Sequence, residues 1–203
     1  MKKRTLMVLV ALVLVFGIAV GGTLALLTSK SAEVTNTFTV GDINIKLDES
    51  KLKEDGTLDT SNRVQQNTYK TVPGKTYPKD PTVTVLNGSE ACYLFVKVTE
   101  TNNTITGLDG KVVSYTVDSS WTQYPGTTDV WYRTVPAATA DTPFQVLTND
   151  QVTVNSKLTK AMVQTFNENK PAINFIAVAV QQDSVTLAEA YAEASAQWTP
   201  ANP

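Results

Sequence analysis

Histidine is absent from this 203-residue chain, and cysteine occurs once, as Cys92. Without histidine there is no Ser-His-Asp or Cys-His triad, no paired-histidine zinc site and no imidazole general base. One cysteine forms neither an intramolecular disulfide nor a cysteine-based structural zinc site. A glycine-rich phosphate loop and a dinucleotide fingerprint are also lacking. The sequence therefore predicts no catalytic residue, no metal and no cofactor, and we expect a protein that is not an enzyme.

Charge is sparse and unevenly placed. Charged residues make up 18% of the chain, below the usual quarter, and the formal net charge is -2. Residues 1–25 contain three basic and no acidic residues, so the 17 basic and 19 acidic residues of the whole chain leave 14 against 19 in the remainder, a net charge of -5. A mildly acidic body without a basic stripe argues against binding to nucleic acid.

The amino terminus has the layout of a secretory signal peptide. Three basic residues at positions 2–4 precede an uncharged apolar run over residues 6–20, and the small residues Thr23 and Ala25 occupy the third and first positions before a cut. Cleavage after Ala25 would leave a single domain of residues 26–203 that begins at Leu26. The protein is therefore expected to be secreted or displayed at the cell surface.

An uncleaved membrane anchor is the alternative for the same segment. Residues 6–27 are uncharged and long enough to span a bilayer as a helix. The glycine pair at positions 21 and 22 weakens a helix and favours cleavage. With cleavage, no stable membrane anchor remains.

Beyond the signal, alternation of apolar and polar residues predicts mainly β structure. In residues 37–47 the apolar parity changes at Gly41 and Asp42, which indicates a β-bulge, whereas residues 48–67 read as an exposed loop or hairpin. Short segments separated by Gly, Pro and Asn turns point to an antiparallel β-sandwich of jelly-roll type. Further strands are expected at residues 68–72, 82–86, 91–98, 112–117, 128–133, 144–147, 151–158 and 173–181.

The strand around Cys92 has apolar residues on both faces. Cys92, Leu94 and Val96 share one face, with Tyr93 and Phe95 on the other. Cys92 is interpreted as a small buried hydrophobe rather than a reactive thiol.

Two helices are expected late in the chain. Residues 159–166 form a short candidate helix. Thr186 and Glu189 have the spacing of a capping box at the start of an alanine-rich helix, which should pack Tyr191 and Trp198 onto a sheet before Pro200 ends it.

Acidic and aromatic residues supply the remaining candidate sites. Asp48-Glu49, Glu54-Asp55 and Asp109 fall in expected loops without calcium-loop spacing, and Asp80 between two prolines is expected to hold a turn. Exposed aromatic side chains could stack on sugar rings or on a partner, although core packing is the default. The possible surface aromatics are Trp121, Tyr124 and Trp131.

Several stretches resemble proteins of the TasA/camelysin type. These are residues 21–25 (GGTLA) followed by 34–41 (VTNTFTVG), residues 73–89 with PGK, KDPTVTV and NGS, and residues 173–181 followed by the helix that ends at Trp198. The resemblance implies secretion by a Gram-positive bacterium, processing by a SipW-type signal peptidase, and a jelly-roll-like sandwich that forms extracellular matrix fibres in biofilms. Camelysin itself is described as a casein-cleaving metalloprotease, and this chain departs from any ordinary metalloprotease pattern because it has no histidine.

Together, the residues and the resemblance suggest an assembly mechanism. An open sandwich has edge strands with unpaired N–H and C=O groups, and an extended segment of another subunit can pair with them. Residues 26–38, with the apolar residues Leu26, Leu27, Val34 and Phe38, form the candidate donor segment. Such a head-to-tail contact does not close and gives a filament. The expected partners are further copies of this chain, the signal peptidase during export and an accessory assembly protein.

Two other functions stay open at this point. One is a monomeric surface or spore-associated binding module, an adhesin that uses the aromatic section. The other is a camelysin-like protease, which the missing histidines disfavour.

Overall fold

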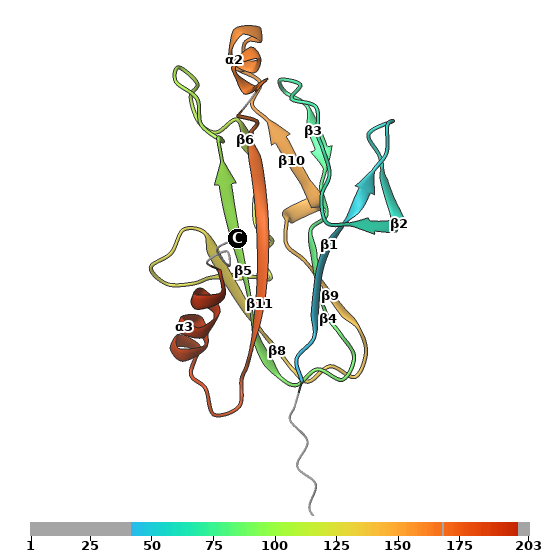
Figure 1. Cartoon of the computed structure of the whole chain (residues 1–203), viewed down its shortest axis with the longest axis vertical. Coiled ribbons are helices and arrows are strands. Elements are labelled where there is room, and N and C mark those ends of the chain that lie inside the picture. The colour runs from blue at the N-terminus through green and yellow to red at the C-terminus, as the bar shows by residue number, and fades with distance from the viewer. Residues whose placement is uncertain (1–41, 168, 199–203) are drawn as a thin grey trace, which may run out of the picture. The chain divides into compact units, whose positions relative to one another are not determined.

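The computed structural model describes residues 42–167 and 169–198. This part of the chain is mainly β structure, with three antiparallel sheets and two α-helices, α2 and α3 (Figure 1). The strands are β1 (Ile45–Leu52), β2 (Leu58–Val64), β3 (Thr76–Pro78), β4 (Thr82–Val85), β5 (Cys92–Thr101), β6 (Val113–Ser114), β7 (Thr122–Gln123), β8 (Val130–Val135), β9 (Thr142–Gln145), β10 (Gln151–Val154) and β11 (Ala172–Gln181).

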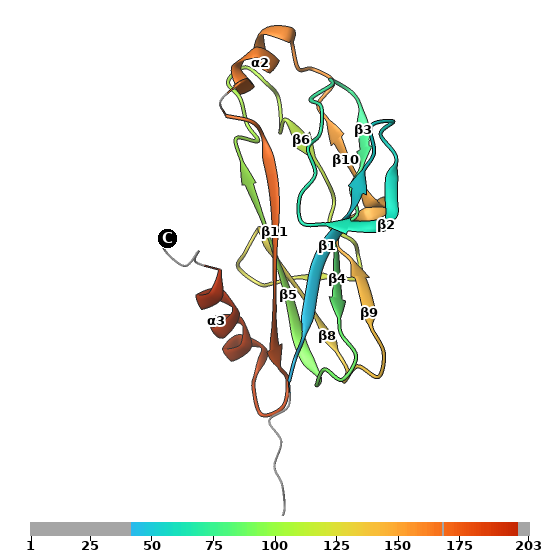
Figure 2. The same cartoon turned by 45° about the vertical axis from the view of Figure 1, so that its right-hand side comes forward.

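Two four-stranded sheets lie on opposite sides of the main core. One has the strand order β2-β1-β4-β9 and the other β11-β5-β8-β7, while β3-β10-β6 forms a smaller third sheet (Figure 2). The longest pairing joins β11 to β5 from Ala172 opposite Thr101 to Gln181 opposite Cys92. Val83 and Val85 of β4 share one buried cluster with Leu94 and Val96 of β5, so these two sheets pack face to face.

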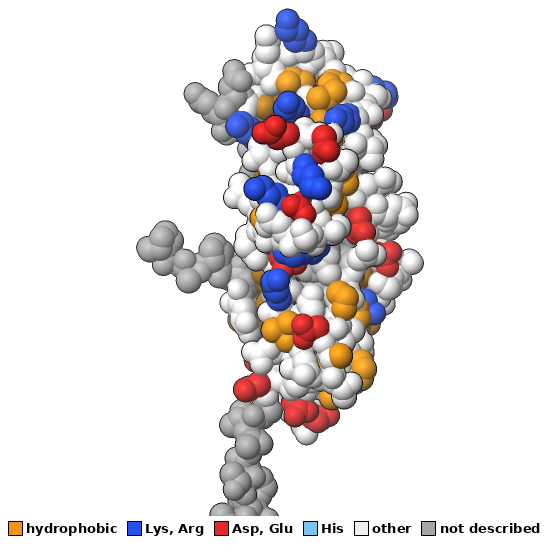
Figure 3. Space-filling model, turned by 90° about the vertical axis from the view of Figure 1, so that its right-hand side faces the viewer, with side chains coloured by type: hydrophobic (Ala, Val, Ile, Leu, Met, Phe, Trp, Pro, Cys, Tyr) orange, Lys and Arg blue, Asp and Glu red, His pale blue; other side chains and the backbone are white. Residues whose placement is uncertain are grey.

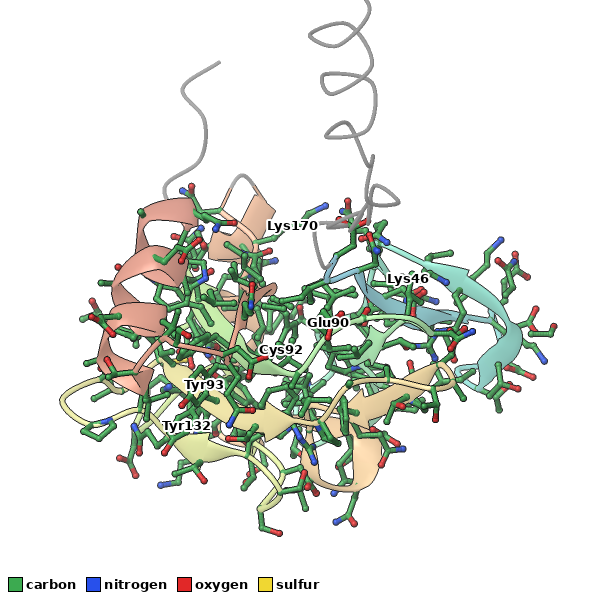
Figure 4. The ribbon with its side chains drawn as sticks, turned by 90° about the horizontal axis from the view of Figure 1, so that it is seen from below. Lys46, Glu90, Cys92, Tyr93, Tyr132 and Lys170 are labelled. Atoms are coloured by element: carbon green, nitrogen blue, oxygen red, sulfur yellow. The ribbon has the colours of Figure 1, made fainter. Side chains whose placement is uncertain are left out.

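The two-faced strand predicted around Cys92 is confirmed. Cys92, Leu94, Val96 and Val98 are buried in the main core, whereas Phe95 belongs to a second cluster. That second cluster is covered by α3 (Leu187–Gln197), and Figure 4 shows Tyr93 and Tyr132 on the side of the sheet that carries this helix. A strand with partners on both faces explains why its sequence is apolar on both.

The capping box of α3 is also confirmed. Thr186 Oγ1 accepts a hydrogen bond from the Glu189 amide at 3.3 Å, and the Glu189 carboxylate accepts one from the Thr186 amide at 2.9 Å. Tyr191 and Trp198 pack around Phe95 with ring centroids 6.2 and 6.5 Å away. The expected helix at residues 159–166 is present as α2 (Lys160–Gln164), continued by a 3-10 turn, η2 (Thr165–Asn167), and another 3-10 turn, η1 (Thr148–Asp150), precedes β10.

The interpretation of residues 48–67 as an exposed loop is half wrong. The segment does form the hairpin β1–β2, but Asp48, Glu49 and Ser50 are buried within β1. Charged residues are rarely buried unless they are paired, and the pairing partners lie too far along the chain to be read from local pattern. A register shift, as at a β-bulge, lies between Ser50 and Lys51. The bulge predicted at Gly41 and Asp42 involves a residue outside the described part.

Three other strand predictions fail or shrink. Residues 68–72 have no regular structure, the strand expected at 112–117 is reduced to β6 and an isolated bridge between Val117 and Leu147, and the strand expected at 151–158 ends at Val154. These segments have the right residue types for strands, but strand formation depends on a neighbouring backbone that the local sequence does not specify.

Candidate functional site

β11 is a sheet edge of unusual length. It has ten residues, pairs with β5 on one side, and has no strand on its other side in the described part of the chain. Its sequence, AINFIAVAVQ, contains no charge. β1 lies close to β11 but does not pair with it. A long, apolar edge with unpaired backbone groups is a template for pairing with another chain, and natural proteins normally protect such edges.

The other edges are protected in ordinary ways. β7 and β6 have two residues each, and β3 has three, the last being Pro78. β2 carries charged residues and the register shift opposite Lys51. The flank of β9 is occupied, because Trp121 Nε1 donates to the Gln145 carbonyl at 2.7 Å. Length, charge, bulges and capping are the usual protections, and β11 has none of them.

A groove of about 790 Å³ lies beside the first half of β11. Its walls come from β1, the segment 65–71, β10, the segment after α2 and residues 172–175 of β11. Apolar side chains from the main core reach its surface, including Val152, Val154 and Phe175. The groove therefore lies beside an unpaired backbone edge and has both polar and apolar side chains in its lining. An extended peptide can bind in such a place by pairing with the edge.

Two tyrosine hydroxyls in this groove have no hydrogen-bond partner among the described residues. Tyr69 and Tyr77 both line it, with their rings edge to face at a centroid distance of 5.7 Å, and both hydroxyls are buried. Burial raises the pKa of Tyr69, and the nearby carboxylates of Glu49 and Asp80 raise it further. Burial also raises the pKa of Tyr77.

A network of ion pairs supports the wall of the groove formed by β1. Lys79 Nζ lies 2.6 Å from Glu49 Oε2, and both side chains are about nine-tenths buried. Arg63 bridges Asp48 and Asp80, with 2.7 Å contacts to each carboxylate. The turn role predicted for Asp80 is therefore wrong: its carboxylate accepts hydrogen bonds from the amide and hydroxyl of Ser50, thirty residues away. Neither are Asp48 and Glu49 loop residues.

The predicted surface position of Trp121 is also wrong. Its side chain is 5% exposed, because the indole fills the space beside β9 and satisfies its N–H there. Tyr124 is half-buried and stacks on Tyr191 with centroids 3.8 Å apart, and half-buried Trp131 packs against the main core. The three aromatics do not form one exposed platform, since Trp121 and Trp131 belong to the main core and Tyr124 to the second cluster.

The other predicted site residues lie outside the described part of the structure. These are the cleavage-site residues Thr23, Ala25 and Leu26 and the donor residues Leu27, Val34 and Phe38. The sequence predicted a strand at residues 173–181 but did not show that it lies at the edge of a sheet. The available signal was the uncharged run of residues 172–181. The local pattern does not distinguish an edge strand from a central strand there.

Cys92 is buried as predicted. Burial raises the pKa of its thiol to about 11, so the nucleophilic thiolate is scarce at neutral pH. Within residues 42–167 and 169–198, no three His, Cys, Asp or Glu side chains gather as a metal site, and no helix is long and apolar enough to cross a membrane.

Surface charge on the face that carries β2 is mixed. Figure 3 shows basic and acidic side chains interspersed there rather than gathered by sign. Comparisons of the chain with protein-family models, curated proteins and solved structures found no match. The function is therefore argued from residues and geometry.

Proposed function

We propose that this chain is a secreted structural protein whose copies assemble into a fibre, each donating an extended N-terminal segment to the edge of the next. The observation that carries the proposal is the ten-residue edge of β11, which pairs with no strand on its outer side among the described residues and borders a groove of polar and apolar side chains. An added strand would extend the sheet β11-β5-β8-β7 to five strands, in a sandwich that we expect to be of jelly-roll type.

The candidate donor, residues 26–38, is long enough for this edge. Thirteen extended residues span about 43 Å, against about 33 Å for the ten residues of β11. The donor contains one basic and one acidic residue, Lys30 and Glu33, and is otherwise uncharged. Its apolar residues could cover the apolar side chains that line the groove.

The placement of donor and acceptor favours a head-to-tail contact. The described chain enters β1 at the end of the sheets where β11 finishes, whereas the groove lies beside the start of β11, towards α2 (Figure 2). A donor leaving one end therefore meets an acceptor near the other end of the next copy, and such heterologous contacts propagate. Cleavage after Ala25 by a SipW-type signal peptidase would release the donor, and an accessory protein could start the fibre.

Deleting the donor tests the proposal. Protein that begins at Leu26 should form filaments visible by electron microscopy, and a version lacking residues 26–35 should stay monomeric. A synthetic peptide of residues 26–40 should bind the shortened protein. Filaments formed equally by both proteins would exclude this donor.

A matched pair of lysine substitutions tests the acceptor. Asn174 is exposed on the edge strand β11, and Thr134 is exposed on the central strand β8. Asn174→Lys should slow filament growth at least about tenfold because a lysine on the edge disfavours pairing, whereas Thr134→Lys should leave growth unchanged. Equal effects of the two changes would remove β11 from the mechanism.

A further inference from the structure

A second hollow, of about 510 Å³, is lined by residues of β8 and β9 and by Arg63, Asp80 and Thr82. Polar side chains dominate its lining, with one aromatic ring and one exposed proline. The residues used below are Asp118, Ser120, Arg133, Pro143, Phe144 and Gln145.

Arg133 is the central group of this hollow. Its guanidinium carbon lies 3.9 Å from the ring centroid of Phe144 and 5.3 Å from that of Trp121. Stacking on Phe144 and packing beside Trp121 restrict the orientation of the planar guanidinium. The buried Trp121 thus contributes to the hollow by positioning Arg133.

The donors of Arg133 are largely unused. Nη1 donates to Ser120 Oγ at 3.3 Å, Nε is buried without a partner, and no carboxylate of the described residues forms a salt bridge with the group. Arg63 is the opposite case, since its three nitrogens donate to Asp48, Ser50 and Asp80. A guanidinium that is fixed in orientation and has N–H groups without protein partners can donate two parallel hydrogen bonds to a carboxylate.

The surrounding groups restrict the ligand further. The Asp118 carboxylate lies in the same hollow, and one of its oxygens accepts from the Ser120 amide at 2.9 Å. A second negative group nearby disfavours a phosphate dianion but accepts hydrogen bonds from hydroxyls. Ser120 and Gln145 offer further polar contacts, and Pro143 offers an apolar face. A ligand that carries one carboxylate on a ring with several hydroxyl groups can interact with all of these side chains.

We propose that the hollow between β8 and β9 binds a sugar acid, with its carboxylate on Arg133 and its hydroxyls on Asp118, Ser120 and Gln145. The site is a different hollow from the strand-accepting groove, although Arg63 and Asp80 of the shared ion-pair network line it, and it gives an exported protein a contact with acidic polysaccharide.

Titration of the full chain in a nonionic detergent tests this site. The probes are a galacturonic acid trisaccharide, the neutral galactose trisaccharide and acetate. Binding is measured by calorimetry and by the indole N–H resonance of Trp121, which is sensitive to movement of the Gln145 backbone because this N–H donates to the Gln145 carbonyl. The acidic trisaccharide should bind and shift that resonance, and the neutral sugar should bind at least about tenfold more weakly. Acetate binding as tight as the acidic sugar would refute the sugar part of the proposal.

Three variants complete the test. Arg133→Gln should weaken binding of the acidic sugar at least about tenfold, and Asp118→Asn should weaken it less. Lys157→Gln removes one exposed positive charge that pairs with Asp109 elsewhere, and should bind like the wild type. Near-ultraviolet circular dichroism tests whether each variant is folded. If Arg133→Gln does not fold, Arg133→Lys replaces it in the test. Arg133→Lys keeps the charge but loses the planar guanidinium, and it should still weaken binding. No binding by the wild type, or equal weakening by Lys157→Gln, would overturn the proposal.

Discussion

At the scale of single residues, buried charge is the feature that sets this chain apart. Asp48, Glu49, Lys79 and Asp80 are each less than 9% exposed. Burying a charge without an opposite charge beside it destabilises the fold, so the removal of either member of a buried ion pair is expected to lower stability. The network ties the hairpin β1–β2 to the segment before β4 and thereby fixes one wall of the groove.

Removing the bridging cation should be strongly destabilising. Arg63→Ala leaves the buried carboxylates of Asp48 and Asp80 without their shared partner, and should lower the free energy of unfolding by about 3 kcal/mol. Lys51→Ala, on the exposed face of the same hairpin, should change it by less than about 0.5 kcal/mol. Urea denaturation followed by tryptophan fluorescence measures both, and equal effects would show that the network is dispensable.

The same network should respond to acid. Burial tends to raise the pKa of Asp48, but its contacts with Lys46 and Arg63 outweigh this and hold the pKa below the ordinary value of 3.8. A depressed folded-state pKa stabilises the fold above the unfolded-state pKa, and this contribution is lost as pH falls through the folded-state value. The stability difference between wild type and Asp48→Asn should therefore be largest near pH 7 and shrink below about pH 4. A constant difference from pH 7 to pH 2 would contradict the assignment.

At the scale of elements, α3 turns the outer face of β5 and β11 into a second core. Ala190 and Ala194 are fully buried against Phe95, Val178 and Val180. Small residues let the helix approach the sheet closely, and the capping box fixes where it begins.

Loss of the cap should be measurable. Thr186→Ala removes the side-chain acceptor for the Glu189 amide and should cost about 1 kcal/mol of stability, whereas Thr186→Ser keeps the acceptor and should cost much less. Thermal unfolding of the two variants beside the wild type gives the comparison. The cap would be irrelevant if serine and alanine behaved alike.

Elements with a local signal were predictable, and those that depend on distant partners were not. The alternation around Cys92 and the spacing of Thr186 and Glu189 predicted β5 and α3 correctly. The burial of Asp48 depends on Arg63, fifteen residues away, so no local pattern revealed it. The groove could not be predicted for the same reason, because strand order decides whether β11 is central or at an edge.

At the scale of the whole molecule, the described residues carry two unlike surfaces. One is a backbone edge beside a groove of mixed polarity, which we propose to accept another copy of the chain, and the other is a polar hollow around Arg133, which we propose to bind a small acidic ligand. Neither requires a titrating catalyst, which agrees with a sequence that has no histidine. Together they would describe a subunit that assembles through its backbone and contacts its surroundings through side chains.

Hydrogen exchange at β11 tests the central claim most directly. Amide exchange is measured by mass spectrometry for assembled protein that begins at Leu26 and for the monomer lacking residues 26–35. If β11 accepts a donated strand, peptides covering residues 172–181 should become strongly protected on assembly, while peptides covering the edge strand β2 should not change. Assembly that leaves exchange in β11 unchanged would contradict the account.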